Sequence, residues 1–346
     1  LTGLRVIRAF SKDDYEEEIF DQANKSYQEM ASLVNKLLVN VRPMLGTILN
    51  FGIIFVLYYG AKLVDIREMG IGELMAFIQY ITQVLIAMIM MSFLLSLLPR
   101  VFASMERINE VLEYEATKTG GEKILSEEIF DIEARDLSFS YPDASLKVLK
   151  DINFHVKKGE TLGIIGGTGS GKSTLLRLLL QFYEPGEGQL FINGIDIKSL
   201  KNFELREEIS YVPQENFFFS KTVAENLSYA REDAEEDIML EAIKNAGAIE
   251  FLGQDPLNKE IARGGKNLSG GQRQRLAIAR ALTRDASLYL FDDSFSALDY
   301  KTDYELRQIL KEKLQDKIVI VVAQRVATIL NADKILVLED GQVAGY

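Results

Sequence analysis

Two apolar stretches in the first third of the chain limit its fold more than any other feature of the sequence. The first, over about 41–64, is almost wholly apolar, and the second, over about 74–98, has no charged residue. Each is long enough for a helix that crosses a bilayer, which needs about 20 apolar residues. The link between them is too short for a domain, so we predict a membrane hairpin. The alternative is a pair of helices buried in a soluble core.

The rest of the chain is more polar. Residues 1–40 have a helical rhythm and are expected to form a cytosolic stalk, and the second apolar helix is expected to extend into the cytosol as far as 113. A polar stretch, 114–129, is typical of a linker. From 130 to 346, short strand-like runs alternate with helical ones, which predicts an α/β domain. No terminal helix follows the last predicted strand, so we expect this domain to be cut short at its C-terminus.

Charge and cysteine content narrow the possible partners. The net charge of −12 argues against nucleic acid as a partner, because neutralising phosphates requires clustered Lys and Arg. The chain has no cysteine, which excludes disulfides and fits a domain that faces a reducing cytosol.

A glycine-rich segment predicts a site for a nucleoside triphosphate. It follows an apolar run, 161–165, precedes an apolar helix, and fits the pattern G-x-x-x-x-G-K-[ST]. Backbone N–H groups of such a loop cradle phosphates at a helix N-terminus, a lysine adds positive charge, and a hydroxyl ligates Mg²⁺. The residues predicted to bind the nucleotide here are Gly166, Gly169, Ser170, Gly171, Lys172, Ser173 and Thr174, and Ser173 is also predicted to ligate the metal.

A second apolar run, 288–291, ends in Asp292 and Asp293. A carboxylate at the end of a buried strand beside a phosphate loop is where a second Mg²⁺ ligand belongs, so Asp292 is predicted to hold the metal.

The segment Leu268-Ser269-Gly270-Gly271-Gln272 and the basic helix after it resemble the signature of the ABC transporter superfamily. Ser269 and Gln272 have the spacing of a capping box, and the two glycines leave the helix tip bare toward an anion. The resemblance implies that Ser269, Gly270, Gly271 and Gln272 contact ATP held by a second subunit, so each ATP lies between two domains.

Other segments resemble the same family. Tyr141 occupies the place of the aromatic residue that stacks on adenine, although a buried Tyr at a strand end is the alternative. Gln214 occupies the place of a glutamine that meets Mg²⁺ and the membrane domain, and 296–299 that of a loop crossing the dimer interface. Upstream, 3–10 resembles the stalk of type I exporters. The hairpin would then be the last two helices of an exporter transmembrane domain.

Two residues depart from the family pattern. Asp293 stands where the family has Glu as the general base, and Asp is shorter by about 1.3–1.5 Å. Gln324 stands where the family has a His that contacts the γ-phosphate, and Gln cannot carry charge or shuttle a proton. The lone histidine, His155, lies in an early strand and is expected to be a strand-face residue.

These departures favour the degenerate half of a heterodimeric exporter in the plasma membrane, whose ATP-binding domain faces the cytoplasm. Its partner would be a second half-transporter with Glu and His at the two positions, and its cargo a small molecule, lipid or peptide. A homodimer with slow hydrolysis, a regulatory nucleotide-binding subunit and a soluble ABC-type ATPase of DNA maintenance are the alternatives.

Overall fold

The computed structural model describes residues 3–114, 120–142, 144 and 146–346, with the backbone alone at 37, 38, 41, 42, 92, 95 and 96. The described chain divides into two compact units, Leu1–Ala116 and Thr117–Tyr346. Each unit is described below by itself.

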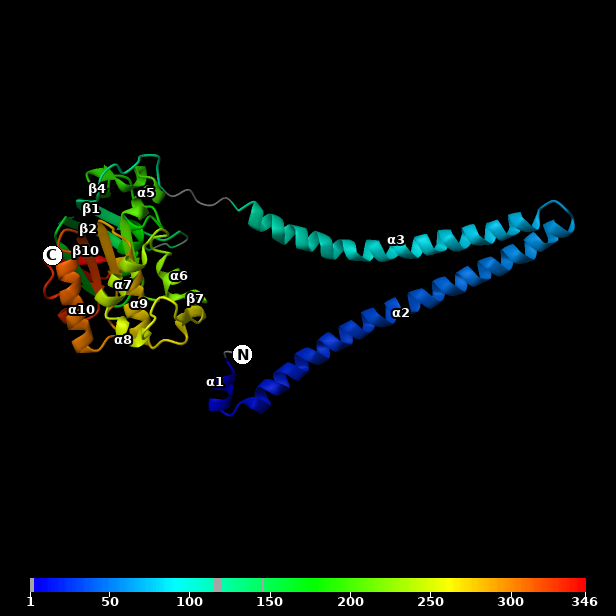
Figure 1. The fold of residues 1–346 in the computed structure, drawn as a ribbon. Helices are drawn as coiled ribbons and strands as arrows, with labels where there is room; N and C mark the ends of the chain where they lie inside the picture. Colours follow the sequence, from blue (N-terminus) through cyan, green and yellow to red (C-terminus); the bar gives the residue numbers. More distant parts are fainter. Residues whose placement is uncertain (1–2, 115–119, 143, 145) are drawn as a thin grey trace. The chain divides into compact units, whose positions relative to one another are not determined.

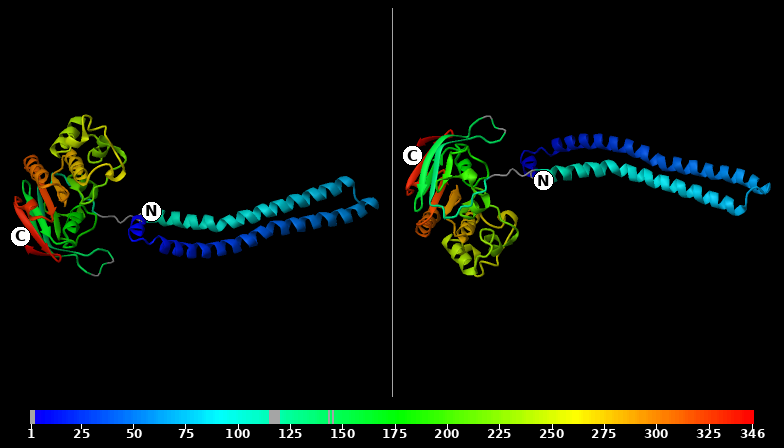
Figure 2. Two further views of the ribbon diagram at one scale, coloured as in Figure 1. Left: turned by 90° about the horizontal axis from the view of Figure 1, so that it is seen from below. Right: turned by 90° about the horizontal axis from the view of Figure 1, so that it is seen from above.

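The N-terminal unit is helical. A short helix, α1 (Leu4–Ala9), precedes two long helices, α2 (Asp13–Asp65) and α3 (Ile71–Leu112), which form an extended hairpin (Figures 1 and 2). Near the turn, Gly60 of α2 lies so close to Leu74 of α3 that an added Cβ would stand 2.2 Å from the leucine Cδ1. Glycine therefore allows the two helices to approach at this point.

The hairpin contains two helical segments long and apolar enough to cross a membrane, Pro43–Asp65 and Ile71–Met91. Their described side chains are mostly exposed within this unit, as Phe51 (69% exposed) and Met90 (67%) illustrate. Within the described residues these segments are therefore not core helices. The apolar part of α3 begins three residues before the predicted start at 74, and α3 then continues through Pro99 to Leu112.

The C-terminal unit contains a mostly parallel sheet in the order β12-β11-β3-β10-β9-β6 and an antiparallel sheet in the order β2-β1-β4-β5. A short ladder joins β7 and β8. The strands are β1 (Asp131–Phe139), β2 (Leu149–Lys157), β3 (Thr161–Gly166), β4 (Leu190–Ile192), β5 (Ile195–Asp196), β6 (Ile209–Val212), β7 (Lys221–Thr222), β8 (Glu260–Ile261), β9 (Leu288–Asp292), β10 (Ile318–Ala323), β11 (Lys334–Glu339) and β12 (Gln342–Gly345).

Helices cover both faces of the parallel sheet, and the lobe that holds α6 to α8 stands beside the sheets (Figure 2). The α-helices of this unit are α4 (Lys172–Leu179), α5 (Asn202–Glu207), α6 (Val223–Leu227), α7 (Glu236–Asn245), α8 (Ile249–Leu252), α9 (Gly270–Thr283), α10 (Tyr300–Lys313) and α11 (Val326–Ile329); short 3₁₀ turns are η1 (Ile197–Ser199) and η2 (Arg263–Gly265).

The alternation of side chains along β9 shows how the core is divided. Leu288 and Leu290 point into one apolar cluster, which they share with α4 and the antiparallel sheet. Tyr289 and Phe291 point into the other, which they share with α7, α9 and α10. Because successive side chains of a strand point to opposite faces, a strand buried on both faces is apolar throughout. This accounts for the continuous apolar run that ends in Asp292.

The predicted linker, 114–129, is only partly a linker. Its residues 115–119 lie outside the described part of the chain. Beyond them, the N–H groups of Gly121 and Lys123 donate to the carbonyl oxygens of Leu200 and Ser199, each at 2.8 Å, and Ile129 is fully buried. The second half of this segment therefore belongs to the α/β domain, although its polar composition gave no sign of it.

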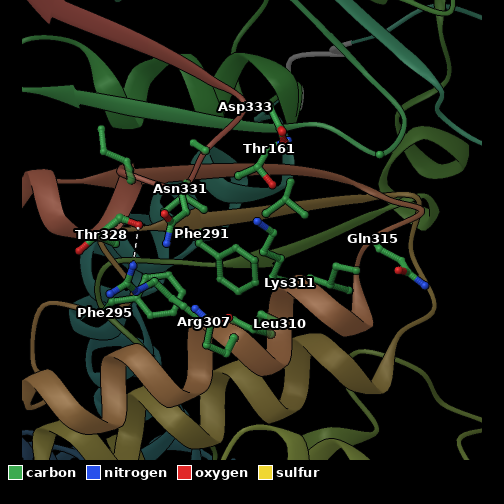
Figure 3. A pocket seen from close by; sticks show the side chains of 17 residues that line it. Thr161, Phe291, Phe295, Arg307, Leu310, Lys311, Gln315, Thr328, Asn331 and Asp333 are labelled. Carbon is green, nitrogen blue, oxygen red and sulfur yellow. Dashed lines mark hydrogen bonds between the residues drawn. The ribbon is translucent and has the colours of Figure 1, made fainter.

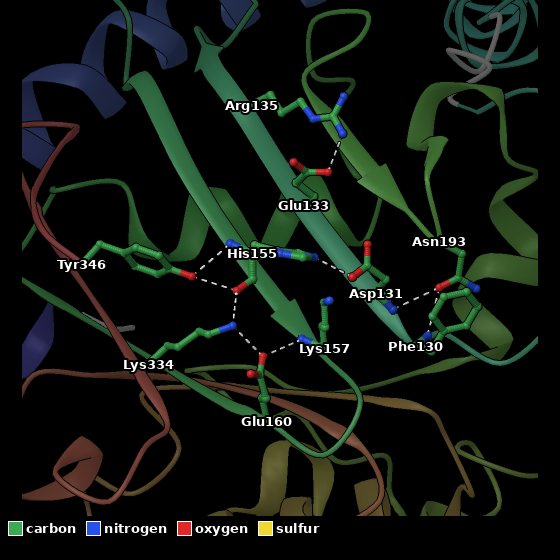
Figure 4. Close-up of polar contacts among 10 residues, drawn as sticks. All are labelled: Phe130, Asp131, Glu133, Arg135, His155, Lys157, Glu160, Asn193, Lys334 and Tyr346. Atoms are coloured by element: carbon green, nitrogen blue, oxygen red, sulfur yellow. Dashed lines mark hydrogen bonds and ion pairs between the residues drawn. The ribbon is translucent and has the colours of Figure 1, made fainter.

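A polar network ties β1, β2 and β11 together around His155 (Figure 4). The His155 ring on β2 contacts the Asp131 carboxylate at 2.6 Å, and its carbonyl oxygen accepts from Lys334 at 2.9 Å and from the Tyr346 hydroxyl at 2.7 Å. Lys334 also pairs with Glu160 at 2.7 Å. His155 is thus a strand-face residue, as predicted, and its contacts join neighbouring strands.

Candidate nucleotide-binding site

The phosphate loop lies between the buried strand β3 and helix α4, as its sequence predicts. Two of its glycines adopt left-handed conformations, Gly169 at φ 82° and Gly171 at φ 99°. At Gly171 an added Cβ would also stand 2.5 Å from Leu149 Cδ2. Glycine is required there both for the backbone conformation and for the close approach of the antiparallel sheet.

Lys172 is buried inside this loop. Its ammonium group donates to the carbonyl oxygens of Gly166 at 2.9 Å and Gly167 at 2.7 Å, and it lies 3.5 Å from the hydroxyl of buried Ser170. Burial lowers the pKa of Lys172, and the nearby carboxylates of Asp293 and Asp292 partly oppose that change. A buried cation on neutral carbonyl groups is well placed to attract an anionic phosphate.

Asp292, at the end of β9, meets α4 at the start of that helix. Its Oδ1 accepts from the Ser173 hydroxyl at 2.9 Å, and its Oδ2 accepts from the Tyr211 hydroxyl at 3.4 Å. Burial raises the pKa of Asp292. Burial also raises the pKa of Tyr211 to about 12, so its phenol stays protonated and donates the hydrogen bond. Sequence reasoning missed Tyr211, because its place depends on β6 lying beside β9.

The donor set fits Mg²⁺. The structure brings the Ser173 hydroxyl and the Asp292 carboxylate together, and both are the oxygen ligands that Mg²⁺ prefers. Among the described residues no group of three or more His, Cys, Asp or Glu side chains could hold a metal.

Asp293 and Gln324 are in direct contact. Strands β9 and β10 are parallel neighbours with Asp292 opposite Val322, so their ends meet at one edge of the sheet. The Gln324 Nε2 donates to the Asp293 Oδ2 at 2.9 Å, and the Asp293 N–H donates to the Val322 carbonyl at 3.0 Å. Burial raises the pKa of Asp293. The two residues that depart from the family pattern thus form one hydrogen-bonded pair.

Two further residues predicted to contact the nucleotide or the metal, Tyr141 and Gln214, are not part of the Asp293–Gln324 pair. Tyr141 is half-buried: its hydroxyl lies 2.9 Å from the Thr174 hydroxyl and accepts from Arg177 at 3.1 Å, while its ring packs edge-on against Phe139 and Tyr183. Gln214 follows β6 and is exposed. Sequence reasoning did not identify Arg177 as the residue that anchors Tyr141.

The tip of α9 is open to solvent. Ser269 and Gln272 form the predicted capping box: the Ser269 Oγ accepts from the Gln272 N–H at 3.3 Å, and the Gln272 side chain accepts from the Ser269 N–H at 2.9 Å. Ser269 and Gly270 are exposed, and Gly271 lies against Ala297 of the loop 296–299. The side chain of Gln274 accepts from the Ala297 N–H at 3.1 Å, which fixes this loop on α9.

A cavity of about 190 Å³ lies elsewhere in the domain, between α10 and the sheet face that carries Phe291 (Figure 3). Its walls include Leu310, Val319 and Ile329, with Lys311 and Asp333 among its polar residues. It is not the predicted nucleotide site, which the phosphate loop and the ends of β9 and β10 form together.

Comparisons with known proteins show the family to which the chain belongs. A family model described as ABC transporter matches residues 149–296, and one described as ABC transporter transmembrane region matches residues 1–89. The chain belongs to the ABC transporter superfamily, and it carries both a transmembrane helical region and an ABC nucleotide-binding domain. The predicted resemblance and the predicted fold class are therefore confirmed.

Relatives cover the whole of this chain. An uncharacterized ABC transporter ATP-binding protein of Mycobacterium tuberculosis is 37% identical over 351 residues, which is 100% of this chain and 60% of the relative. The probable multidrug resistance ABC transporter ATP-binding/permease protein YheI of Bacillus subtilis is 35% identical over 99% of this chain and 59% of its own length. The alpha-hemolysin translocation ATP-binding protein HlyB of Proteus vulgaris is 33% identical over 99% of this chain and 49% of its own length.

A solved structure of a bacterial Atm1-family ABC exporter with ATP bound matches with a TM-score of 0.83 at 25% identity, over 99% of this chain and 61% of that chain. The chain thus spans about three fifths of the length of the Mycobacterium and Bacillus relatives and of the solved exporter chain, and about half of HlyB.

Proposed function

We propose that this chain is part of the ATP-binding and permease subunit of an ABC exporter in the plasma membrane, with its ATP-binding domain in the cytoplasm. The family match and the likeness to an exporter fold support this proposal. The cargo in this proposal is a small molecule, lipid or peptide. Two relatives have names that include multidrug resistance and alpha-hemolysin translocation, which supports a role in transport.

The pocket at the phosphate loop binds ATP in this proposal. Lys172 and the N–H groups at the start of α4 hold the β- and γ-phosphates, and Tyr141 stacks on the adenine. Ser173, Asp292 and Gln214 hold Mg²⁺, which neutralises phosphate charge when bound. The buried position of Lys172 on loop carbonyl groups supports its role as the phosphate-binding cation.

Hydrolysis in this pocket is slow in our proposal, and the Asp293–Gln324 hydrogen bond is the observation that carries it. A carboxylate only accepts hydrogen bonds, so the amide nitrogen of Gln324 must face Asp293. The short carboxylate is thereby held by a neutral amide. Misplacement of a catalytic group by about 1 Å can lower a rate on the order of 10²-fold.

The partner in this proposal is a second half-transporter, a different chain with Glu and His at these positions. The exposed tip of α9, with Ser269, Gly270, Gly271 and Gln272, completes the partner's ATP site across the interface. ATP binding closes the two cytoplasmic domains, and hydrolysis in the partner's pocket resets them.

The substitution Ser269→Ala tests this division of labour in the full-length transporter assembled with its co-purifying chain. Loss of a hydroxyl that faces the transferred phosphate should lower ATPase and transport rates by about 10²-fold, the scale found for one lost transition-state donor. Thr222→Ala is the matched control, because Thr222 caps α6 with the same capping box as Ser269 but lies on another helix.

Turnover that survives Ser269→Ala would show that this chain takes no part in hydrolysis. Its ATP would then act only as a structural staple, and the exporter proposal in its present form would fail.

A further inference from the structure

Arg177, on α4, is a cation that the proposed binding of ATP does not use. It lies on the same face of the helix as Thr174, because residues three apart are neighbours on a helix surface. Both residues contact the Tyr141 hydroxyl. The Arg177 Nη1 donates to it at 3.1 Å, and the Thr174 hydroxyl lies 2.9 Å from it. The phenol is thereby held on α4 from two positions.

Two other aromatic rings contact the ring of Tyr141. Its centre stands 5.1 Å from that of Phe139, on β1, and 4.9 Å from that of Tyr183, which follows α4; both pairs are close to perpendicular. Tyr183 packs in turn against Phe139, with ring centres 5.8 Å apart. Packing of this kind is favourable beyond the apolar area that it buries. The three rings therefore form one cluster at the end of β1.

The hydroxyl contacts and the ring contacts restrict different torsions of Tyr141. The phenol oxygen lies on the axis about which the ring turns at χ2, so hydrogen bonds to this oxygen fix the direction of the side chain and not the rotation of the ring. A tyrosine χ2 is a broad torsion by itself, and the rings of Phe139 and Tyr183 limit it here. The two sets of contacts together set the place and the plane of the Tyr141 ring.

We propose that Arg177 is a positioning residue for the nucleotide base: it holds the Tyr141 ring where the ring stacks on adenine. Arg177 then contributes to the affinity for the base and not to the affinity for the phosphates. This inference rests on the proposed function, in which Tyr141 contacts the adenine. A ring that is already held in its binding position loses less conformational freedom when the base binds, which raises affinity.

The charge of Arg177 has a second effect, at the metal end of the pocket. Burial raises the pKa of Asp292, while hydrogen bonds from Ser173 and Tyr211 and the nearby guanidinium of Arg177 oppose that change. An effect of Arg177 through Asp292 would alter the Mg²⁺ concentration that ATP binding requires. An effect through Tyr141 would persist at saturating Mg²⁺, which is therefore the condition for the test.

Binding of ATP and of inorganic triphosphate to the full-length chain tests this role, because inorganic triphosphate has the phosphates but no base. Arg177→Met keeps a long side chain on α4 and removes the donor. It should weaken ATP binding by about 5–10-fold, part of the gain that stacking of one base supplies, and leave the affinity for triphosphate within about twofold. Equilibrium dialysis with labelled ATP measures the first affinity, and displacement of that ATP by triphosphate measures the second.

Tyr141→Phe is the second variant, because it removes the hydroxyl that Arg177 binds and keeps the ring. It should weaken ATP binding at least as much as Arg177→Met, and the double variant should be no worse than Tyr141→Phe alone, since both changes remove one shared contact. Arg135→Met is the matched control. Arg135 is likewise exposed, and its guanidinium carbon stands 4.6 Å from the centre of the Phe191 ring, but it lies on β1. This control should leave both affinities unchanged.

An unchanged ATP affinity in Arg177→Met would overturn the role of Arg177. Equal losses for ATP and triphosphate would do the same, because they would place the effect on the phosphate loop, and so would losses that add in the double variant. Lys172→Ala should weaken binding of both ligands, so its effect shows that the proposed pocket binds phosphates even if Arg177 has no role. A starting chain that binds neither ligand would contradict the proposed function, and this inference with it.

Discussion

At the scale of single residues, the character of the pocket depends on how Asp293 and Gln324 meet. Each was identified in the sequence as a separate departure from a family pattern. Their hydrogen bond depends on β9 and β10 being parallel neighbours, which bring the two side chains to one edge of the sheet. Asp293 also has φ 49°, a left-handed conformation that Asp tolerates better than most residues. The left-handed turn at the end of β9 is therefore suited to Asp at position 293.

Because the two side chains contact each other, restoring fast ATP hydrolysis should require both family residues, Glu at position 293 and His at position 324. In a full-length transporter whose partner has lost its own catalytic carboxylate, Asp293→Glu with Gln324→His should raise the remaining ATPase rate by at least about 10-fold, given the cost of misplacement. Either change alone should give less than a threefold gain, because each leaves one unmatched member. Steady-state phosphate release measures all of these rates.

The double variant Asp293→Asn with Gln324→His provides the control, because it restores the imidazole without a base. A gain in this control, or no gain in the restored pair, would count against the assigned roles of both residues.

At the scale of elements, the sequence was most informative where local pattern and local structure coincide. The strand–loop–helix at the phosphate loop, the capping box of α9 and the buried strand β9 all follow from spacing within a few residues. The contacts of Tyr211 with Asp292 and of Arg177 with Tyr141 could not be predicted, because they depend on the strand order of the sheet and on the packing of α4. The packed half of the predicted linker was missed for the same reason.

Gly171 gives a prediction at this scale. Gly171→Ala should lower the free energy of unfolding by about 1–3 kcal/mol, because φ 99° is strained for alanine and its Cβ would meet Leu149. It should also weaken ATP binding, because it displaces the start of α4. Thermal unfolding and titration with MgATP measure the two effects.

Gly188→Ala is the comparison variant, since Gly188 has φ 69° but nothing within 4 Å of an added Cβ. It should cost less stability and leave ATP affinity unchanged. Equal effects of the two substitutions would mean that strain alone, and not contact with the antiparallel sheet, fixes the phosphate loop.

At the scale of the whole molecule, composition separated the chain correctly into a membrane helical part and an α/β domain. The family matches fall on the same two parts, at residues 1–89 and 149–296. Composition gives no sign of the asymmetry that we propose, in which this chain's pocket holds ATP and its α9 tip completes the partner's pocket. That proposal depends on two side chains at the edge of one sheet.

The fate of ATP bound to this chain alone tests the central proposal most directly. Full-length chain purified without a companion should be incubated with Mg²⁺ and ATP, separated from free nucleotide, and its bound nucleotide identified over time. We expect ATP to be retained largely uncleaved, because Asp293 is short and is held by Gln324. Rapid conversion to ADP, at a rate that Asp293→Asn abolishes, would contradict the proposal of a slow pocket.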